Sequence, residues 1–228
     1  MRYVYPSMLI LSMVMNIIVV IISSKKFKYK KDEIVSMLLI DTVGILIGGV
    51  LYTFIFSGGF GFSSLGGLLG GLLFLGIYSI LLKKDYKYIL NLFMPSIPLM
   101  YAISKIGCFV AGCCHGIPYD GIGHIVYNNS LVAPKGISLF PVQIVETIVF
   151  LIIFIWIVYK YLKHNISFIL IIKEIIICSI FKFLLDFLRY DHVTKVITPN
   201  QIMCLVLIVI GVIKLLSLNK KLEKSVFK

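Results

Sequence analysis

Charged side chains are scarce in this chain of 228 residues, and acidic ones are the scarcest. Only 14% of the residues are charged and just 10 are acidic, whereas roughly a quarter of a soluble domain is charged. The chain also lacks a polar linker, an internal repeat and the period-two alternation of membrane β-barrel strands. These absences argue against a soluble protein or a barrel, and they predict one domain over residues 1–228.

Long hydrophobic runs take the place of the missing charges, since 60% of the residues are hydrophobic. A helix of about 20 apolar residues crosses the hydrocarbon core of a bilayer and satisfies its own backbone hydrogen bonds. Seven runs meet this requirement. The expected fold is therefore an all-α membrane protein with seven transmembrane helices, at residues 5–22, 34–57, 65–82, 88–106, 142–162, 167–188 and 200–216.

The formal net charge of +12 comes mainly from four lysine clusters, which lie at residues 25–31, 83–87, 160–163 and 220–228. All four fall on the same side of a seven-span chain. Because basic loops stay in the cytoplasm, the N-terminus is expected outside and the C-terminus in the cytoplasm. The basic surplus thus reflects topology and attraction to anionic lipid headgroups, and we expect no nucleic-acid partner.

The segment KIGCFVAGCCHG at residues 105–116 concentrates thiols in an otherwise apolar protein. It opens an irregular segment, residues 107–141, that is expected at the outer face. Four interpretations stay open: tight packing, a disulfide of Cys108 with Cys113 or Cys114, a catalytic thiolate, or zinc binding. Adjacent cysteines rarely ligate one tetrahedral ion comfortably, so we expect no metal and no cofactor.

Two later spans carry polar residues at helical spacing. Gln143 and Glu146 are three residues apart, while Lys182, Asp186 and Arg189 are spaced by four and then three. Each set therefore lies on one helical face. Charges at a bilayer edge usually face a protein-lined cavity, although a structural ion pair or a charge favoured at a helix start would explain them as well.

Glycine and proline mark two further features. Gly66 and Gly67 belong to a glycine-rich stretch, residues 57–71, which suits either close helix packing or a lipid-headgroup site made of bare amides. Pro95 and Pro98 interrupt the fourth span, and such prolines commonly kink a membrane helix beside a cavity.

Taken in order, these segments resemble the bacterial prolipoprotein diacylglyceryl transferase family over nearly the whole chain. Residues 64–70 resemble its His-Gly-Gly-Leu-x-Gly loop, and residues 105–116 its signature Arg-x-Gly-Asn-Phe-x-Asn-x-Glu-x-x-Gly. Residues 140–146 match His-Pro-x-Gln-x-x-Glu, and residues 182–189 match Arg-Phe-x-x-Glu-x-x-Arg. Gln201 opens the last span as in the family's x-Gln-x-x-Ser pattern. The order of five motifs carries the resemblance.

Several motif positions depart from the family pattern. The loop histidine is replaced by Leu65, and the signature arginine by Lys105. The signature asparagines and glutamate, and the later arginine and glutamate, are replaced by Cys108, Ala111, Cys113, Lys182 and Asp186. The positions that agree are Gly107, Gly116, Pro141, Gln143, Glu146 and Arg189. We interpret the chain as a divergent, cysteine-bearing branch.

The resemblance implies a multi-pass enzyme of the bacterial plasma membrane. Its partners would be phosphatidylglycerol or another anionic phospholipid and a lipoprotein precursor, whose cysteine thiol accepts the diacylglyceryl group as glycerol phosphate leaves. The catalytic candidates are Lys105, Glu146, Arg189, His115 and Cys113. The candidates for substrate binding are Gly66, Gly67, Gly107, Gln143, Lys182 and Asp186.

The implied chemistry assigns roles to these residues. The cations would hold the headgroup and the departing phosphate, with Glu146 or Asp186 orienting them. His115 or His124 would be the base for the acceptor thiol, and Cys113 or Cys114 an alternative covalent carrier. The competing function is a non-enzymatic thiol-redox or metal-binding membrane protein that retains the transferase fold.

Overall fold

The computed structural model describes residues 4–26, 29–59, 61–163 and 168–226, without the side chains of residues 57 and 220–226. The predicted start of the sixth span, at residue 167, lies outside these residues. The described helices and strands are α1 (Val4–Ser24), α2 (Lys31–Ser57), α3 (Ser64–Leu81), α4 (Tyr86–Phe93), η1 (Met94–Ser96), α5 (Ile97–Ala111), β1 (Ile125–Val126), β2 (Ser138–Leu139), α6 (Val142–Lys163), α7 (Phe168–Asp186), η2 (Tyr190–Val193) and α8 (Pro199–Val226).

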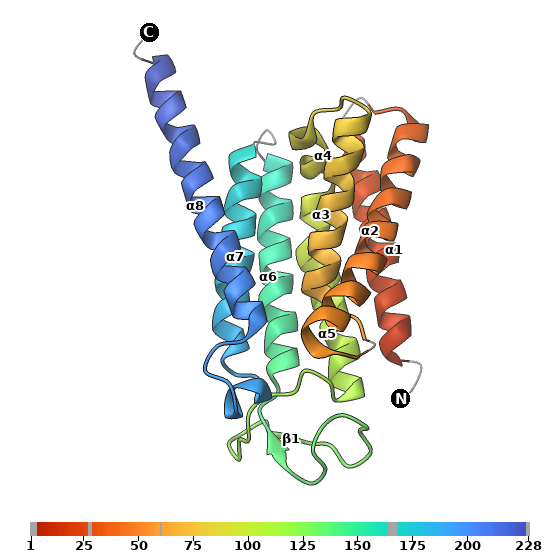
Figure 1. The fold of residues 1–228 in the computed structure, drawn as a ribbon, viewed down its shortest axis with the longest axis vertical. Helices are drawn as coiled ribbons and strands as arrows, with labels where there is room; N and C mark the ends of the chain where they lie inside the picture. Colours follow the sequence, from red (N-terminus) through yellow and green to blue (C-terminus); the bar gives the residue numbers. More distant parts are fainter. Residues whose placement is uncertain (1–3, 27–28, 60, 164–167, 227–228) are drawn as a thin grey trace.

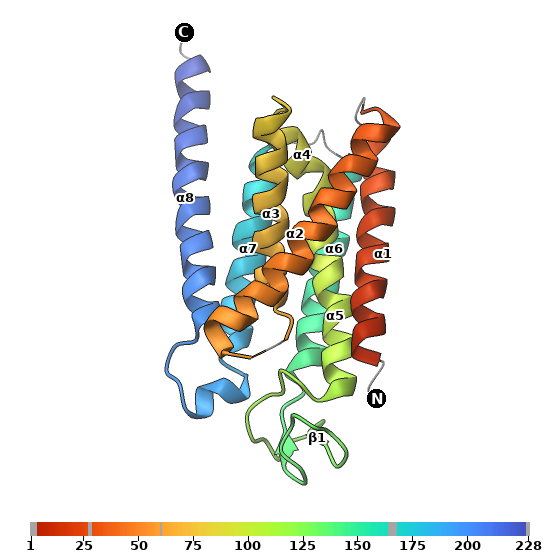
Figure 2. The ribbon, with the colours of Figure 1, turned by 45° about the vertical axis from the view of Figure 1, so that its right-hand side comes forward.

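The long helices run side by side in one bundle, and a loop with two short strands covers one end of it (Figures 1 and 2). Within the described residues, six helical segments are long and apolar enough to cross a membrane, which confirms an all-α membrane protein. The predicted sixth span, α7, is not among them, because Lys173, Glu174, Lys182 and Asp186 interrupt its apolar sequence. It nevertheless lies against α6 and α8.

The predicted fourth span is broken where its prolines lie. A 3₁₀ turn, Met94–Ser96, separates α4 from α5. Proline cannot donate a backbone hydrogen bond and its ring crowds the preceding turn. The break therefore confirms the predicted interruption by Pro95, and Ser96 beside it lines an internal cavity. The helical segment is longer than predicted, from Tyr86 to Ala111.

Helices α2 and α3 pack closely because glycines face each other. A Cβ atom on Gly70 would lie 2.1 Å from the carbonyl oxygen of Gly44, and one on Gly48 would lie 2.4 Å from that of Gly66. No side chain fits at such distances. Small residues here let the two backbones touch, which is the usual basis of tight packing between membrane helices.

The irregular segment begins at residue 112, not at residue 107 as predicted. Gly107 lies within α5, where a Cβ atom would stand 2.9 Å from the Cβ of Met8 in α1, so this glycine serves helix packing. Helix α5 ends five residues later at Gly112, whose φ of +76° suits a residue without Cβ. Strands β1 and β2 then pair in an antiparallel hairpin.

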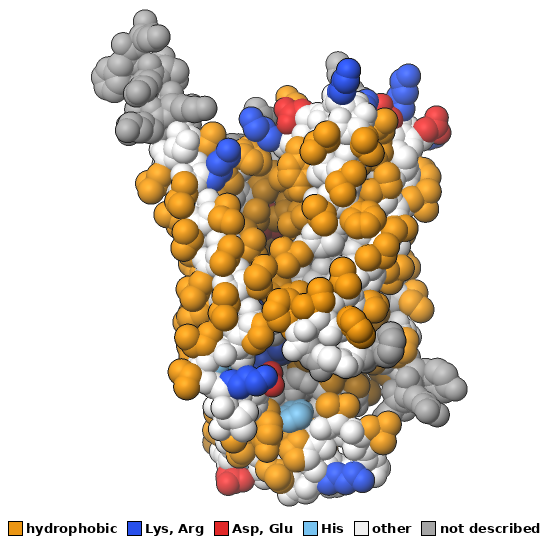
Figure 3. Space-filling view, viewed as in Figure 1, with side chains coloured by type: hydrophobic (Ala, Val, Ile, Leu, Met, Phe, Trp, Pro, Cys, Tyr) orange, Lys and Arg blue, Asp and Glu red, His pale blue; other side chains and the backbone are white. Residues whose placement is uncertain are grey.

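The flanks of the bundle are covered with exposed apolar side chains, and the visible lysines gather near its two ends (Figure 3). Leu39, Ile80, Ile155 and Leu216 are each more than 60% exposed. An apolar belt of this kind suits contact with lipid. The end opposite the hairpin carries the exposed ion pair between Lys84 and Glu33, at 2.6 Å.

Candidate functional site

Glu146 is the centre of a buried network of charges at the hairpin end of the bundle. Its carboxylate is 3.0 Å from Lys105 Nζ of α5 and 2.9 Å from Lys182 Nζ of α7, and it accepts a hydrogen bond of 2.7 Å from the hydroxyl of Tyr101. The Glu146 side chain is fully buried. Three helices are thus joined through a single carboxylate.

A second carboxylate extends the network along α7. Asp186 accepts from Lys182 at 3.1 Å, as their spacing of four residues allows, and from the hydroxyl of Thr198. The guanidinium of Arg189 stands 3.5 Å from Asp186 and 4.0 Å from Glu146. Both carboxylates and all three cations therefore belong to the same cluster.

The charges of this cluster do not cancel. Lys105, Lys182 and Arg189 are three cations against the two carboxylates Glu146 and Asp186, and none of the five is more than 8% exposed. Among these five side chains, one buried positive charge is left over. Because an unpaired buried charge is costly, the cluster is suited to receive an anion.

Arg189 has hydrogen-bonding capacity to spare. Among the described residues, its Nε–H is buried without an acceptor, and its carboxylate contacts of 3.5 and 4.0 Å are longer than hydrogen bonds. Burial alone would lower its pKa, but the neighbouring Cys114, Glu146 and Asp186 hold the pKa well above the usual range. Arg189 is therefore a permanent cation whose donors are still available to a ligand.

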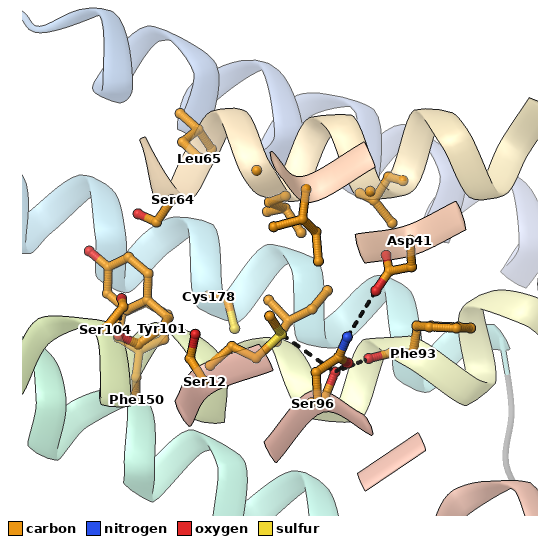
Figure 4. Close-up of a pocket in the computed structure, with 18 of the residues that line it drawn as sticks. Ser12, Asp41, Ser64, Leu65, Phe93, Ser96, Tyr101, Ser104, Phe150 and Cys178 are labelled. Carbon is orange, nitrogen blue, oxygen red and sulfur yellow. Dashed lines mark hydrogen bonds between the residues drawn. The ribbon is translucent and has the colours of Figure 1, made fainter. Parts of the chain in front are cut away.

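Two cavities meet at this cluster. One, of about 250 Å³, has mixed polar and apolar walls that include Lys105, Lys182 and Arg189. The other, of about 140 Å³, is almost wholly apolar and runs along the helices from Tyr101 and Ser104 at one end to Asp41 at the other (Figure 4). Both are lined by Ser64, Leu65, Ser104 and Lys182. A charged compartment thus adjoins an apolar one.

Comparison with known proteins agrees with this amphipathic arrangement. The profile of the prolipoprotein diacylglyceryl transferase family matches residues 2–217. The chain belongs to that family. A phosphatidylglycerol–prolipoprotein diacylglyceryl transferase of Clostridium tetani (strain Massachusetts / E88) is 31% identical, over 92% of this chain and 90% of its own length. A transferase of the same name, numbered 2, from Clostridium perfringens (strain 13 / Type A) is 28% identical over 84% and 81%.

The family motifs that the sequence suggested come from α5, α6 and α7 and meet at the cluster. Lys105, Glu146, Lys182, Asp186 and Arg189 are all in it. Gln143, one turn before Glu146, instead donates to the backbone carbonyl of Cys113 at 2.9 Å. In this family member Gln143 fixes the loop that follows α5.

The two histidines considered as bases occupy different surroundings. His115 bonds through Nδ1 to the carbonyl of Gly112 at 3.0 Å, and its ring lies 4.9 Å from that of Tyr190. Its Nε2 is buried and has no hydrogen-bond partner among the described residues. His124 is exposed in the loop near the hairpin. Neither histidine is among the residues that line the two cavities.

The loop glycines are mainly packing residues. A Cβ on Gly66 would lie 2.2 Å from the Cβ of Tyr52, and the amide of Gly66 is already bonded to Ser63 Oγ at 3.3 Å. The amide of Gly67 is bonded to the Ser63 carbonyl, although Gly67 itself borders the apolar cavity. Leu65, where the family has histidine, lines both cavities.

All five cysteines are free, so the alternative of a disulfide from Cys108 to Cys113 or Cys114 is not formed. The three thiols nevertheless converge, with their Sγ atoms within 4.8 Å of one another. Hydrogen bonds from Cys108 and Cys113, together with the nearby Arg189 and Lys105, lower the pKa of Cys114. Cys108 and Cys114 also line the charged cavity.

Two contacts of the cluster were not expected from the sequence. Tyr101 bonds Glu146, and its ring faces Lys105 Nζ at 4.9 Å; its position one helical turn before Lys105 was the available signal. Thr198 bonds Asp186 from the start of α8. Thr198 and Gln201 also bond each other as a helix-start pair, and the Thr-x-x-Gln pattern signals such a cap.

Proposed function

We propose that the protein transfers a diacylglyceryl group from phosphatidylglycerol to the cysteine thiol of a lipoprotein precursor. The observation that carries the proposal is the junction of a cationic cavity with an apolar one at Ser64, Leu65, Ser104 and Lys182. A phospholipid has the same division, with an anionic phosphate next to apolar chains. Family membership and the names of the two clostridial relatives support the same reaction.

The residues of the cluster meet the demands of this reaction. Arg189 has hydrogen-bond donors without an acceptor, and these donors and the excess positive charge would bind the headgroup phosphate. The same groups would stabilise the negative charge that develops on glycerol phosphate as it leaves. Glu146 would hold Lys105 and Lys182 in position. In the reaction a C–S bond forms at the glycerol carbon as the C–O bond to phosphate breaks.

We also propose that residues 1–228 form one domain that crosses the bacterial plasma membrane seven times, with the cluster at the outer leaflet. Helix α7 would cross the membrane as the sixth span and complete the set of seven, since it runs beside α6 and α8 and its charges Lys182 and Asp186 are buried within the protein. The lysine-rich end would be cytoplasmic, as the distribution of basic residues suggests. The N-terminus would then lie outside, on the side of the hairpin.

Complementation tests the proposed function. In a bacterium depleted of its own transferase, this chain should restore growth and the lipidation shift of a lipoprotein on a gel. The Lys182→Ala and Arg189→Ala variants should lower lipidation at least about tenfold, because one charged contact to phosphate is worth about 1.5–3 kcal/mol. The matched control is Lys84→Ala, which removes a lysine of an exposed ion pair outside both cavities.

Because the extent of lipidation also depends on how much enzyme is present, the amount of each variant protein is measured in isolated membranes. Equal lipidation by wild type, Lys182→Ala and Arg189→Ala at equal protein levels would rule out the cluster as the lipid site. Failure of the well-expressed wild type to lipidate in this strain and in a purified assay would rule out the transferase function itself.

A further inference from the structure

The three thiols at the end of α5 have a geometry that sequence spacing did not suggest. Cys108 lies in the last turn of α5, while Cys113 and Cys114 follow the helix. Gly112 and Cys114 both adopt left-handed backbone, with φ of +76° and +54°. That conformation is rare for a residue with a Cβ. In this turn the three Sγ atoms come within 4.8 Å of one another.

The surrounding structure holds this turn in place. Gln143 Nε2 donates to the carbonyl of Cys113 at 2.9 Å, and the amide of Tyr190 donates to the carbonyl of His115. A Cβ on Gly116 would lie 2.3 Å from the Phe140 carbonyl, so the chain there is pressed against its neighbour. The thiols are therefore brought together by a fixed loop anchored on α6 and η2.

Three convergent free thiols make a ligand set for a soft or borderline metal ion. In a tetrahedral zinc site the Zn–S distance of about 2.3 Å places the sulfur atoms about 3.8 Å apart. The three Sγ atoms lie within 4.8 Å of one another, so no pair exceeds that spacing by more than about 1 Å. Adjacent cysteines were expected to be poor partners in one site, but the left-handed conformation of Cys114 removes this objection.

The charge of the surroundings favours such a site. A divalent ion with three thiolates carries one net negative charge, while the cluster of Lys105, Lys182, Arg189, Glu146 and Asp186 carries one net positive charge. Cys108 and Cys114 line the same cavity as the three cations. The nearby cations would stabilise the thiolates that a metal ion requires, and three protein ligands would leave a fourth position for a substrate.

We propose that Cys108, Cys113 and Cys114 bind a zinc ion whose fourth position receives the acceptor cysteine of the lipoprotein precursor. The proposal rests on the proposed transferase function. Leu65 offers no base that could deprotonate the acceptor thiol. Metal coordination would activate this thiol instead, because a coordinated thiol loses its proton. The bound sulfur forms the C–S bond, the C–O bond to phosphate breaks, and the released proton ends on glycerol phosphate.

The same chemistry argues against a covalent cysteine carrier. Direct attack by Cys113 or Cys114 on the glycerol carbon would form a thioether on the enzyme. Transfer of the diacylglyceryl group from this thioether to a second thiol would require the enzyme's thiolate to leave from an alkyl carbon. A thiolate is a far poorer leaving group there than a phosphate ester. Cysteines that serve as metal ligands avoid this dead end, since no bond to carbon forms on the enzyme.

Metal analysis of the full chain, purified under reducing conditions in detergent, tests the site. Elemental analysis should find one zinc per chain, and cobalt substitution should give thiolate-to-cobalt charge-transfer bands and the intense visible bands of a tetrahedral site. The variants Cys108→Ser, Cys113→Ser and Cys114→Ser should each bind zinc at least about tenfold more weakly. Cys178→Ser and Cys204→Ser are matched controls, because both residues lie outside the thiol cluster.

A readout on the wild type covers the case in which a serine variant misfolds. Zinc should slow alkylation of Cys113 and Cys114 by a maleimide at least about tenfold, and a chelator should reverse the protection. The site is overturned by wild type that lacks zinc and gains no protection, by equal zinc affinity in the three variants, or by a disulfide within the cluster.

Transfer activity separates this inference from the proposed function. If the wild type binds zinc but does not transfer lipid, the metal site is supported and the proposed transferase function is contradicted. If the wild type transfers lipid equally with and without zinc, the transferase function is supported and the proposed role of zinc in it is contradicted. Loss of transfer on chelation, with recovery when zinc is returned, is the outcome that the proposal expects.

Discussion

At the scale of single residues, the cluster depends on the charge of Glu146. This carboxylate contacts Lys105 and Lys182 and is fully buried. Glu146→Gln keeps the shape and still accepts from Tyr101, but it leaves the buried Lys105 without a carboxylate and Lys182 with Asp186 alone. We expect a loss of about 3–5 kcal/mol in the free energy of unfolding, measured by denaturant titration in mixed micelles.

The same substitution in an exposed pair is the control. Glu33 pairs with Lys84 where the two side chains are 27% and 36% exposed, and Glu33→Gln should cost no more than about 1 kcal/mol. If the two substitutions lower the free energy of unfolding equally, the buried network at Glu146 stabilises the protein no more than a surface ion pair does.

The sequence predicted much of this cluster and missed part of it. The spacing of Lys182, Asp186 and Arg189 predicted one helical face, and this is right only for the first two. Helix α7 ends at Asp186, and Arg189 reaches the cluster from the extended residue before η2. Their meeting with Lys105 depends on how α5, α6 and α7 pack, which only the family resemblance suggested. The sequence left the convergence of the cysteines open, since a disulfide and a zinc site were two of its four interpretations. Spacing could not predict the left-handed backbone at Cys114, because a residue with a Cβ rarely adopts it.

At the scale of helices, the contact between α2 and α3 is the most sensitive to added volume. Gly70→Ala would place a Cβ 2.1 Å from the Gly44 carbonyl and 2.8 Å from the Gly48 Cα. Both are backbone atoms, so the helices must separate. We expect a loss of about 1–3 kcal/mol in the free energy of unfolding, visible as a lower melting temperature in detergent.

Gly76 provides a control in the same helix. A Cβ there would meet its nearest neighbour, the ring of Tyr86, only at 3.9 Å. Gly76→Ala should therefore leave the melting temperature unchanged or raise it, since alanine favours helix. A melting temperature lowered equally by the two substitutions would mean that the glycine contact is not specific.

Prediction at this scale succeeded where the cause was local. Pro95 interrupts the fourth span as expected, because proline acts on its own turn. The predicted start of the irregular segment was wrong by five residues, since Gly107 lies within α5 and packs against Met8. The helix ends instead at Gly112, whose left-handed backbone is a local stop signal.

At the scale of the whole molecule, the orientation in the membrane follows from the lysine clusters. We expect Lys135→Cys, in the hairpin loop, to react with a membrane-impermeant maleimide in intact cells. Lys87→Cys, which is also exposed but lies at the opposite end, should react only after the membrane is opened. Labelling of Lys87→Cys alone in intact cells would reverse the topology. Labelling of both would mean that the helical segment Tyr86–Ala111 does not cross the membrane.

Composition alone was sufficient to predict the membrane class, because apolar runs of this length have few other uses. The number of spans is harder to predict. Helix α7 carries four charged residues and resembles a span only once Glu174, Lys182 and Asp186 are seen to be buried within the bundle. Hydropathy cannot tell such buried charges from those that face water.

The central claim is that the cationic cavity holds the phospholipid whose diacylglyceryl group is transferred. Phosphatidylglycerol labelled separately in its acyl chains and in its terminal glycerol, incubated with the purified chain and a precursor peptide, tests the claim directly. We predict that the acyl label appears on the peptide cysteine, that the glycerol label leaves as glycerol phosphate, and that Arg189→Gln lowers both at least about tenfold. Acyl label absent from the peptide, or transfer unaffected by Arg189→Gln, would contradict the account.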